Sequence, residues 1–406
     1  MQIVAPPIER HVQTSRGVRV ALVVALAHGV TDMYASFVPP LLPRLMDELG
    51  LSITLAATLA VSYSIAGALP QPLFGYAADR FGRRSFAVLG PLVAGIFVAS
   101  IGFASSFWPL VVLLALGGLG SAAFHPAGAS YAVRVGEGRG GGARYSLFAF
   151  GGAAGFAIGP IAAVSIAQWR GTEGLWIAML PAVVFAPVVY AALPSGRTEA
   201  AAASAPPPRP SQVLAHLRGP LGLMFGISAT MAFVQRTYLT MEPIIVDAAG
   251  GSETLGAVAL SVYLGAQAAG MVTGGLLADR VDRGSLLVHL CFWALPAHLL
   301  AIWIGPSGAL GMMLTACAGF LGLATLPPIV VMAQELVPTA ASASSAIVMG
   351  LAWATGSLGV LVTGALADRI GAYQAALLSM PVMLVALGLA LHPALRVATG
   401  RRPNTG

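Results

Sequence analysis

Long apolar stretches recur along the whole chain, and they constrain its fold more than any other feature. About twelve of them run for roughly 18 to 25 residues each, long enough for a helix to cross a lipid bilayer. In lipid only helices and closed barrels satisfy every backbone hydrogen bond, so the pattern predicts an all-α membrane protein. The predicted spans are 18–40, 53–77, 85–104, 108–133, 145–168, 174–193, 219–246, 254–278, 285–304, 309–335, 341–366 and 373–392.

The composition excludes a soluble globular protein. Charged residues make up 9% of the 406 positions, and the mean hydropathy is +0.84, whereas a soluble domain has about a quarter of its residues charged. The chain has no glycine-rich phosphate loop, no nucleophile elbow and no Cys/His cluster with metal-ligand spacing, so we expect no enzyme, cofactor or metal. Its basic residues lie in short loops beside the spans, so we expect no nucleic-acid partner.

The arginines predict the orientation of the spans. All 21 basic residues are arginine, and with high alanine and glycine content this is typical of a GC-rich bacterial genome. An even number of spans puts both tails and the loops after spans 2, 4, 6 and 8 on one side, and most arginines lie there. By the positive-inside rule, we expect a multi-pass protein of the bacterial inner (plasma) membrane with both termini cytoplasmic. The arginines on this side are Arg10, Arg16, Arg19, Arg80, Arg83, Arg84, Arg134, Arg139, Arg144, Arg197, Arg209, Arg218, Arg280, Arg283, Arg396, Arg401 and Arg402.

One polar break and two internal repeats divide the chain. Residues 194–217 are rich in alanine and proline and predict a cytoplasmic linker between two six-helix bundles, residues 1–193 and 218–406. The segment GYAADR after span 2 recurs about 200 residues later as GLLADR after span 8. A second repeat, LGSA in span 4 and LGLA in span 10, has nearly the same spacing. Parallel repeats of this kind are typical of transporters.

The segment 75–84, GYAADRFGRR, resembles the loop signature of the major facilitator superfamily. The resemblance implies that this loop locks helix ends in one state of an alternating-access cycle, because an aspartate there can contact a helix N-terminus or an arginine. The second copy departs from the pattern at Asp282 and Gly284, which predicts a weaker latch. A third similar segment, 364–371, falls after span 11 on the opposite side, and we treat it as incidental. The expected latch residues are Gly75, Asp79, Arg80, Gly82, Arg83, Arg84, Asp279 and Arg280.

Further motifs narrow the resemblance. Residues 28–39 (HGVTDMYASFVP), Gln71-Pro72, residues 124–126 (FHP), the glycines of span 5 and residues 333–336 (AQEL) together resemble the fosmidomycin-resistance branch of the superfamily. That branch implies proton-driven export of a small compound, including phosphonate antibiotics. Span 5 departs from the antiporter signature, since Ala163-Val164 stands where two glycines are expected. It retains Gly155, Gly159 and Pro160, which predict close helix approach and a kink.

Ionisable residues within the spans are the candidates for chemistry, since a charge in lipid costs about 2.5–3.5 kcal/mol. His28, Asp32 and Ser36 lie one helical turn apart on span 1. A carboxylate partly removed from water can load and release a proton near neutral pH. Asp32 is therefore the first candidate proton carrier, and His28 would tune it or share the proton. The alternative is a structural aspartate that is hydrogen-bonded to a neighbouring helix.

Span 7 supplies the second set of candidates. Arg236 lies near its middle and should face span 1 across a cavity, where it would bind a substrate anion or neutralise Asp32 or Glu242. Glu242 is a further candidate for proton coupling, or else a solvated charge at the end of the span. His125, in span 4, would line the cavity or pack as a satisfied histidine. The other candidates for substrate binding are Tyr34, Gln71, Gln235, Tyr238 and Gln267.

The sequence thus predicts a transporter with twelve transmembrane helices in two pseudo-symmetric six-helix bundles, the major facilitator fold. The expected function is proton-coupled antiport that exports a small, anionic, drug-like compound by alternating access. A proton-coupled importer of a small organic anion is the near alternative, because Asp32 and Arg236 would serve either direction. A transport-dead sensor or partner subunit is a distant alternative, because the tails and linker are short. The expected partners are the substrate, protons and the bilayer, and the family habit implies a monomer.

Overall fold

The computed structural model describes residues 7–134, 141–194, 217–337 and 341–395. These residues are almost entirely helical, and no strand occurs among them, so the predicted all-α fold is confirmed. Apart from residues 194 and 217, the predicted linker lies outside the described part of the chain.

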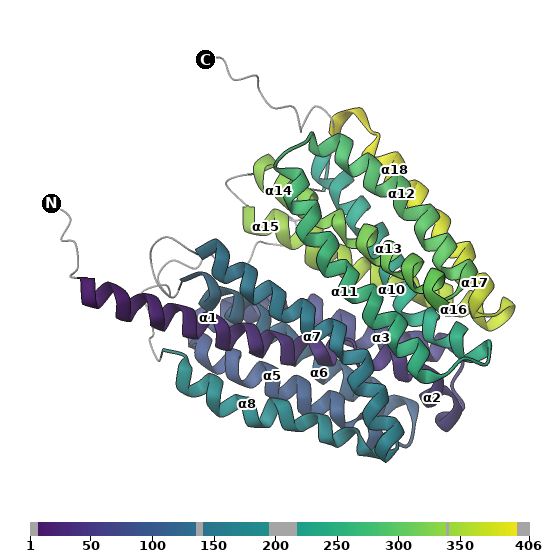
Figure 1. Ribbon diagram of the computed structural model, residues 1–406, viewed down its shortest axis with the longest axis horizontal. Helices are drawn as coiled ribbons and strands as arrows, with labels where there is room; N and C mark the ends of the chain where they lie inside the picture. Colours follow the sequence, from purple (N-terminus) through teal and green to yellow (C-terminus); the bar gives the residue numbers. More distant parts are fainter. Residues whose placement is uncertain (1–6, 135–140, 195–216, 338–340, 396–406) are drawn as a thin grey trace.

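The helices up to Ala192 form what we call the N-terminal group, drawn in purple to teal in Figure 1. In this group α1 packs along α7, α6 packs against α3 and α5, and α8 covers α5. Its elements are α1 (Pro7–Ala35), α2 (Val38–Leu49), α3 (Ile53–Ala68), α4 (Gln71–Phe81), α5 (Arg83–Ala99), η1 (Ser100–Phe103), α6 (Phe107–Arg134), α7 (Gly141–Arg170), η2 (Thr172–Ala178) and α8 (Met179–Ala192).

The helices from Pro220 onward form the C-terminal group, drawn in green to yellow in Figure 1. Here α11 packs on α13, α10 on α16, and α12 on α13 and α18. The elements are α10 (Pro220–Ala248), α11 (Glu253–Ala278), α12 (Arg283–Ile304), α13 (Gly308–Ala324), α14 (Leu326–Leu336), α15 (Ala341–Ala346), the π-helical turn η5 (Ile347–Leu351), α16 (Ala352–Ile370), α17 (Ala372–Ser379), η6 (Met380–Val382) and α18 (Met383–Ala390).

Eleven helical segments of the described chain are long and apolar enough to cross a membrane. The 29-residue helix α10 completes the twelve, and it carries the ionisable residues Arg236, Glu242 and Asp247. The first span was predicted to end near residue 40, but α2 continues it to Leu49. The left-handed Gly50 (φ 64°) then ends the helix.

Glycines bring α7 into direct contact with α1. A Cβ atom on Gly155 would lie 1.9 Å from the backbone oxygen of Gly29, and one on Gly159 would lie 2.1 Å from Oγ of Ser36. Only a residue without a side chain permits this separation of the two backbones. The predicted close approach is therefore confirmed. α7 continues as one helix from Gly141 to Arg170 through Pro160, and the kink stays a prediction.

The two groups meet at the end of the molecule that holds the turn at Gly50, which we call the Gly50 end. α16 packs on α3, α7 on α11 and α2 on α10, and Figure 1 shows the groups converging there, on the right. Arg44 of α2 donates two hydrogen bonds, of 2.9 and 2.7 Å, to the carboxylate of Glu253 at the start of α11. Gln168 of α7 donates to the Thr254 hydroxyl at 3.0 Å. Paired charges and amides thus join the groups at this end.

Asp368, near the end of α16, makes the third contact of this kind. Its carboxylate accepts hydrogen bonds from the backbone N–H groups of Ile53 (2.7 Å) and Thr54 (3.2 Å) and from the Thr54 hydroxyl (2.5 Å). These N–H groups lie at the start of α3, where a helix leaves donors unpaired and favours a negative charge. The expectation that segment 364–371 is incidental is therefore wrong, since its aspartate caps a helix of the other group.

Candidate functional site

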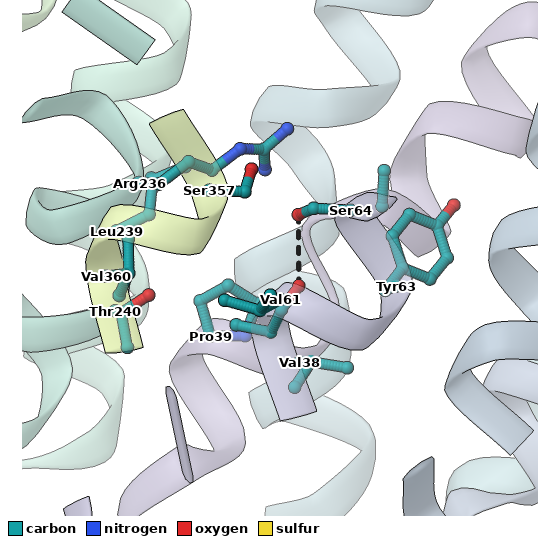
Figure 2. A pocket seen from close by; sticks show the side chains of 12 residues that line it. Val38, Pro39, Val61, Tyr63, Ser64, Arg236, Leu239, Thr240, Ser357 and Val360 are labelled. Atoms are coloured by element: carbon teal, nitrogen blue, oxygen red, sulfur yellow. Dashed lines mark hydrogen bonds between the residues drawn. The ribbon is translucent and has the colours of Figure 1, made fainter. Parts of the chain in front are cut away.

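A small cavity lies between the two groups beside Arg236 (Figure 2). Its volume is about 20 Å³, which is room for about one water molecule. This cavity by itself is therefore too small for an organic substrate. The α1–α2 junction, α3, α10 and α16 line the cavity through Ala35, Val38, Pro39, Ala60, Val61, Tyr63, Ser64, Arg236, Leu239, Thr240, Ser357 and Val360.

Arg236 is a half-buried cation without an anionic partner among the described residues. The ion pairs of the described residues do not include it, and its Nε–H has no hydrogen-bond acceptor. The predicted pairing with Asp32 or Glu242 is thus absent from this structure. The guanidinium carbon lies 5.6 Å from the centre of the Trp353 ring, which supplies a cation–π contact. A buried donor without an acceptor is unfavourable, and an anion at this point would satisfy it.

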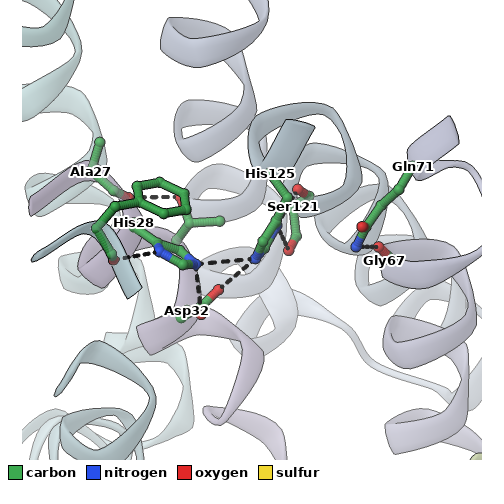
Figure 3. A network of polar contacts seen from close by, with 9 residues as sticks. Ala27, His28, Asp32, Gly67, Gln71, Ser121 and His125 are labelled. Atoms are coloured by element: carbon green, nitrogen blue, oxygen red, sulfur yellow. Dashed lines mark hydrogen bonds and ion pairs between the residues drawn. The ribbon is translucent and has the colours of Figure 1, made fainter. Parts of the chain in front are cut away.

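His28, Asp32 and His125 form a compact cluster in the N-terminal group (Figure 3). The Asp32 carboxylate lies between the two rings: Oδ2 is 3.1 Å from Nε2 of His28, and Oδ1 is 3.2 Å from Nε2 of His125. The two Nε2 atoms are 3.3 Å apart. The Asp32 and His125 side chains remain 20% and 26% exposed, so water can reach the cluster. The donor atoms lie within 4.8 Å of one another, a set that can hold a proton or a cation.

Neighbouring helices fix the two rings. The His28 Nδ1 lies 2.8 Å from the backbone oxygen of Phe148 on α7, whose ring stacks on the imidazole at 4.1 Å between centres. Gly152, one turn later, makes room, because a Cβ atom there would lie 2.4 Å from the His28 ring. The His125 Nδ1 lies 2.7 Å from the backbone oxygen of Ser121, one turn earlier on α6. His125 therefore belongs to the cluster with Asp32, whereas the sequence placed it at the substrate site or in packing.

Glu242 lies deep inside the C-terminal group. The residue is 1% exposed, so the alternative of a solvated charge at the end of the span is wrong. Its Oε1 has no hydrogen-bond partner. An ionisable residue buried within a span is a candidate for function, so Glu242 stays a candidate for proton coupling.

The amide and phenol side chains predicted on span 7 form a separate buried network. Gln235 donates to Gln267 at 2.8 Å, which leaves Oε1 of Gln235 and Nε2 of Gln267 without partners. Tyr238 stacks on Tyr263 with the ring centres 4.3 Å apart, and its hydroxyl lies 3.2 Å from that of Thr315. The unpartnered amide atoms can bind a polar substrate group. The Tyr238 side chain already contacts Tyr263 and Thr315.

Two predicted substrate residues lie elsewhere. The Tyr34 hydroxyl donates to the backbone oxygen of Ala178 at 2.6 Å inside the N-terminal group. Tyr34 follows Asp32 by two residues, which is about 200° around a helix, so the two side chains face opposite ways. Gln71 donates to the backbone oxygen of Gly67 at 2.8 Å and lies apart from the cluster in Figure 3.

The latch segment 75–84, which covers the end of α4 and the start of α5, is held by residues of the N-terminal group. Arg83 pairs with Asp79 one turn earlier, with a shortest distance of 2.5 Å. Arg84 donates from Nε to the backbone oxygen of Tyr190 at 3.0 Å, and its guanidinium lies over the Tyr190 ring at 3.7 Å. Gly82 has φ 110°, a conformation that requires glycine.

The other latch positions lie on α4 and directly after α11. Arg80 donates to the Tyr76 hydroxyl at 3.4 Å, and Gly75 faces Pro126. In the second copy, Asp279 and Arg280 follow directly after α11.

In the second copy of the loop signature, Asp282 departs from the pattern and caps the helix that follows it. Asp282, which replaces a glycine, caps α12 by accepting from the backbone N–H of Ser285 at 2.7 Å. The adjacent Arg283 pairs with Glu335 at 2.5 Å.

Comparisons with known proteins place these residues in a family. Residues 24–358 match the family model of the Major Facilitator Superfamily. The chain belongs to the major facilitator superfamily. Among curated relatives, this major facilitator protein is 30% identical over 360 residues to the fosmidomycin resistance protein of Escherichia coli (strain K12), covering 85% of this chain and 86% of the relative. It is 26% identical over 246 residues to the chloramphenicol resistance protein of Streptomyces lividans, covering 59% and 62%.

Solved structures of other members share the fold. A bacterial homolog of the human lysosomal transporter Spinster, in an inward-facing and unoccupied conformation, superposes with a TM-score of 0.74 at 14% identity, covering 95% of this chain and 97% of that one. A D-xylose–proton symporter superposes with a TM-score of 0.71 at 18% identity, covering 92% and 96%. The twelve-helix fold is thereby confirmed, and the protein is a multi-pass membrane transporter rather than an enzyme.

The structure also identifies contacts that the sequence did not single out. Trp353, beside Arg236, follows the π-helical turn η5 and had no distinguishing motif. The backbone acceptor at Phe148 depends on the packing of α7 against α1 and leaves no sequence signal. Asp368 did carry a signal, because its segment matches the loop signature, but only the structure shows what it contacts.

Proposed function

We propose that this transporter is a proton-coupled antiporter that exports a small organic anion by alternating access. The observation that carries the proposal is the division of charge between the groups: a His–Asp cluster on α1 and α6, and an unpaired Arg236 on α10. The names of the relatives, which include fosmidomycin and chloramphenicol resistance proteins, support export of a drug-like compound.

In this proposal Asp32 and His28 provide the proton site, with Glu242 as a second carboxyl. Arg236 binds the anionic group of the substrate with two N–H donors, as guanidinium groups do with carboxylates and phosphates. The spare amide atoms of Gln235 and Gln267 bind its polar portion. A buried ionisable residue in a membrane helix is by default a candidate for this kind of work.

Alternating access requires contacts that form in one state and break in another. The pairs at the Gly50 end, Arg44 with Glu253 and Asp368 with the start of α3, would hold that end closed. The latch segment 75–84 would hold the opposite end closed in the other state, by contacts that replace those within its own group.

A proton-coupled importer is the second candidate, and one observation favours it. Asp32 of the N-terminal group and Arg236 of the C-terminal group carry opposite charges within the spans. A proton on the cluster cancels the attraction of Asp32 for Arg236 and leaves the arginine free for an anion, so proton and anion bind together, as a symporter requires. The names of the resistance proteins support export, whereas the opposite charges of Asp32 and Arg236 support uptake.

We also propose the arrangement of the chain in the membrane. The two six-helix bundles comprise residues 1–193 and 218–406, both termini are cytoplasmic, and the transporter acts as a monomer. The arginine-rich loops support this orientation. Fusion of alkaline phosphatase after Gly50 and after Gly82 tests it: activity is expected only after Gly50, and the reverse pattern would invert the topology.

The deciding experiment for function uses energised inside-out vesicles and a panel of compounds that includes fosmidomycin. Antiport predicts that addition of a transported compound collapses the pH gradient, and that Asp32→Asn abolishes the response. Acid-driven accumulation in right-side-out vesicles, without efflux, would instead establish the importer. Absence of both in folded protein would contradict proton coupling.

A further inference from the structure

The Nδ1 atoms of His28 and His125 determine where their hydrogens are. Each Nδ1 lies within 2.8 Å of a backbone carbonyl oxygen, Phe148 for one ring and Ser121 for the other. A carbonyl oxygen only accepts hydrogen bonds, so each Nδ1 carries a hydrogen. In a neutral imidazole the other nitrogen is then a bare acceptor. Both Nε2 atoms, which face Asp32, are therefore acceptors unless the cluster takes up a proton.

The three facing groups cannot all be acceptors. An ionised carboxylate offers no hydrogen, and its oxygens lie 3.1 and 3.2 Å from the two Nε2 atoms, which are themselves 3.3 Å apart. Without an added proton, lone pairs would face one another at hydrogen-bonding distance in a partly buried site, which is unfavourable. The geometry thus requires a proton, and each proton on an Nε2 converts a repulsive contact into a charge-assisted hydrogen bond to Asp32.

The proton belongs on the rings rather than on the carboxyl. In water an imidazole holds a proton about two to three pH units more tightly than a carboxylate does. Asp32 contacts both rings, each with a different oxygen, so it can stabilise a proton on either one. We propose that the coupling proton is carried by the His28–His125 pair and that Asp32 stays ionised as the positioning counter-charge. This inference deepens the proposed proton coupling and rests on it.

The surrounding charges limit the pair to one exchangeable proton. Besides His125 of α6, the ionisable side chains of other helices whose charge acts on Asp32 are Tyr63 of α3 and Arg236 of α10. α7 faces the cluster with the apolar Phe148 and with Gly152. Two imidazolium rings with Nε2 atoms 3.3 Å apart would repel one another. One proton leaves the cluster neutral, and its release leaves the cluster with a net negative charge.

Nuclear magnetic resonance of the full chain, labelled with ¹⁵N-histidine and reconstituted in lipid nanodiscs near pH 7, tests the location of the proton without a substrate. Loss of a signal in His28→Gln and His125→Gln assigns the two rings. We expect Nε2 shifts displaced toward the protonated value in both rings, and an unprotonated Nε2 in His298. Bare Nε2 atoms in both rings, with a protonated Asp32 carboxyl seen by ¹³C, would overturn the inference whether or not transport is proton-coupled.

Transport by the same variants gives an independent readout in vesicles with fosmidomycin as the probe. His28→Gln and His125→Gln should each reduce gradient-driven flux by about tenfold or more, while counterflow exchange changes by less than about twofold. His298→Gln, a buried histidine of the C-terminal group, and His289→Gln, an exposed one, serve as matched controls that keep both activities. Gradient-driven flux that persists in both cluster variants would place the proton on Asp32. Flux that EDTA abolishes would place a metal cation in the cluster.

Discussion

Two histidines, one in each group, make the same hydrogen bond with one ring nitrogen but differ in the partner of the other nitrogen. His125 in the N-terminal group and His298 in the C-terminal group each place Nδ1 against the carbonyl oxygen one turn earlier, at 2.7 and 2.8 Å. Beyond that anchor, Nε2 of His298 lies 3.0 Å from the Tyr263 hydroxyl, which can donate. Nε2 of His125 faces the Asp32 carboxylate, which cannot.

The difference teaches that a buried histidine is identified by its second partner. With a phenol, the neutral ring is satisfied and structural. With a carboxylate and a second imidazole, the same ring is satisfied only after it takes up a proton. The two groups of this pseudo-symmetric fold have thus diverged: one holds a cluster that takes up a proton, and the other holds a neutral network beside an unpaired arginine.

The largest effect is expected from removing the counter-charge of the cluster. Asp32→Asn should reduce gradient-driven transport by about a hundredfold, because the imidazole pair loses the negative charge that holds its proton. Counterflow exchange should persist. The measurement is flux in vesicles with and without a pH gradient. A mutant that still couples flux to the gradient would show that the cluster is only structural.

Arg236 tests the other half of the comparison. Arg236→Ala should weaken binding of an anionic substrate by about ten- to a hundredfold, since a charge-assisted hydrogen bond contributes about 1.5–3 kcal/mol. Arg236→Lys should recover part of the affinity through its charge. Binding measured by thermal shift would contradict this role if the Ala variant matched wild type for an anion.

A smaller effect is expected from removing the contact of Asp368 with the start of α3, which joins the two groups. Asp368→Asn removes the negative charge at the start of α3, a contribution of about 0.3–1 kcal/mol, so the Gly50 end should open a few times more often. Labelling of a cysteine placed at Thr58, in a background without the native cysteines, measures this opening. Asp247→Asn, an exposed residue at the same end, is the control, and equal labelling in both would refute the latch role of Asp368.

The smallest effect is expected in the neutral network. Tyr263→Phe removes the donor to His298 and should destabilise the protein by about 0.5–1.5 kcal/mol. Proton coupling should be unchanged, because this histidine takes no part in it. Thermal unfolding and the pH profile of flux check the two expectations. A changed pH profile in this variant would show that His298 also takes part in proton coupling.

Sequence reasoning recovered most of the fold because lipid imposes simple rules. Span length, the polar break and the repeated loop signature are local properties, and all apolar stretches correspond to helices of the structure. Its largest boundary error came at α2, which carries the charged residues Arg44 and Glu48. In the fold these side chains bind partners on other elements, Glu253 and Thr172, so the helix continues.

The sequence by itself determined which chemical groups lie within the membrane: His28 and Asp32 one turn apart, His125 before a proline, and a single arginine in span 7. Only the tertiary structure decided which of them meet. Helix packing brought His125 to Asp32 across nearly a hundred residues, turned Tyr34 away, and set Asp368 against the start of α3. The physical reason is that periodicity along one helix fixes the direction of a side chain, but its partner depends on how separate helices pack, and glycines such as Gly152 and Gly155 set that spacing.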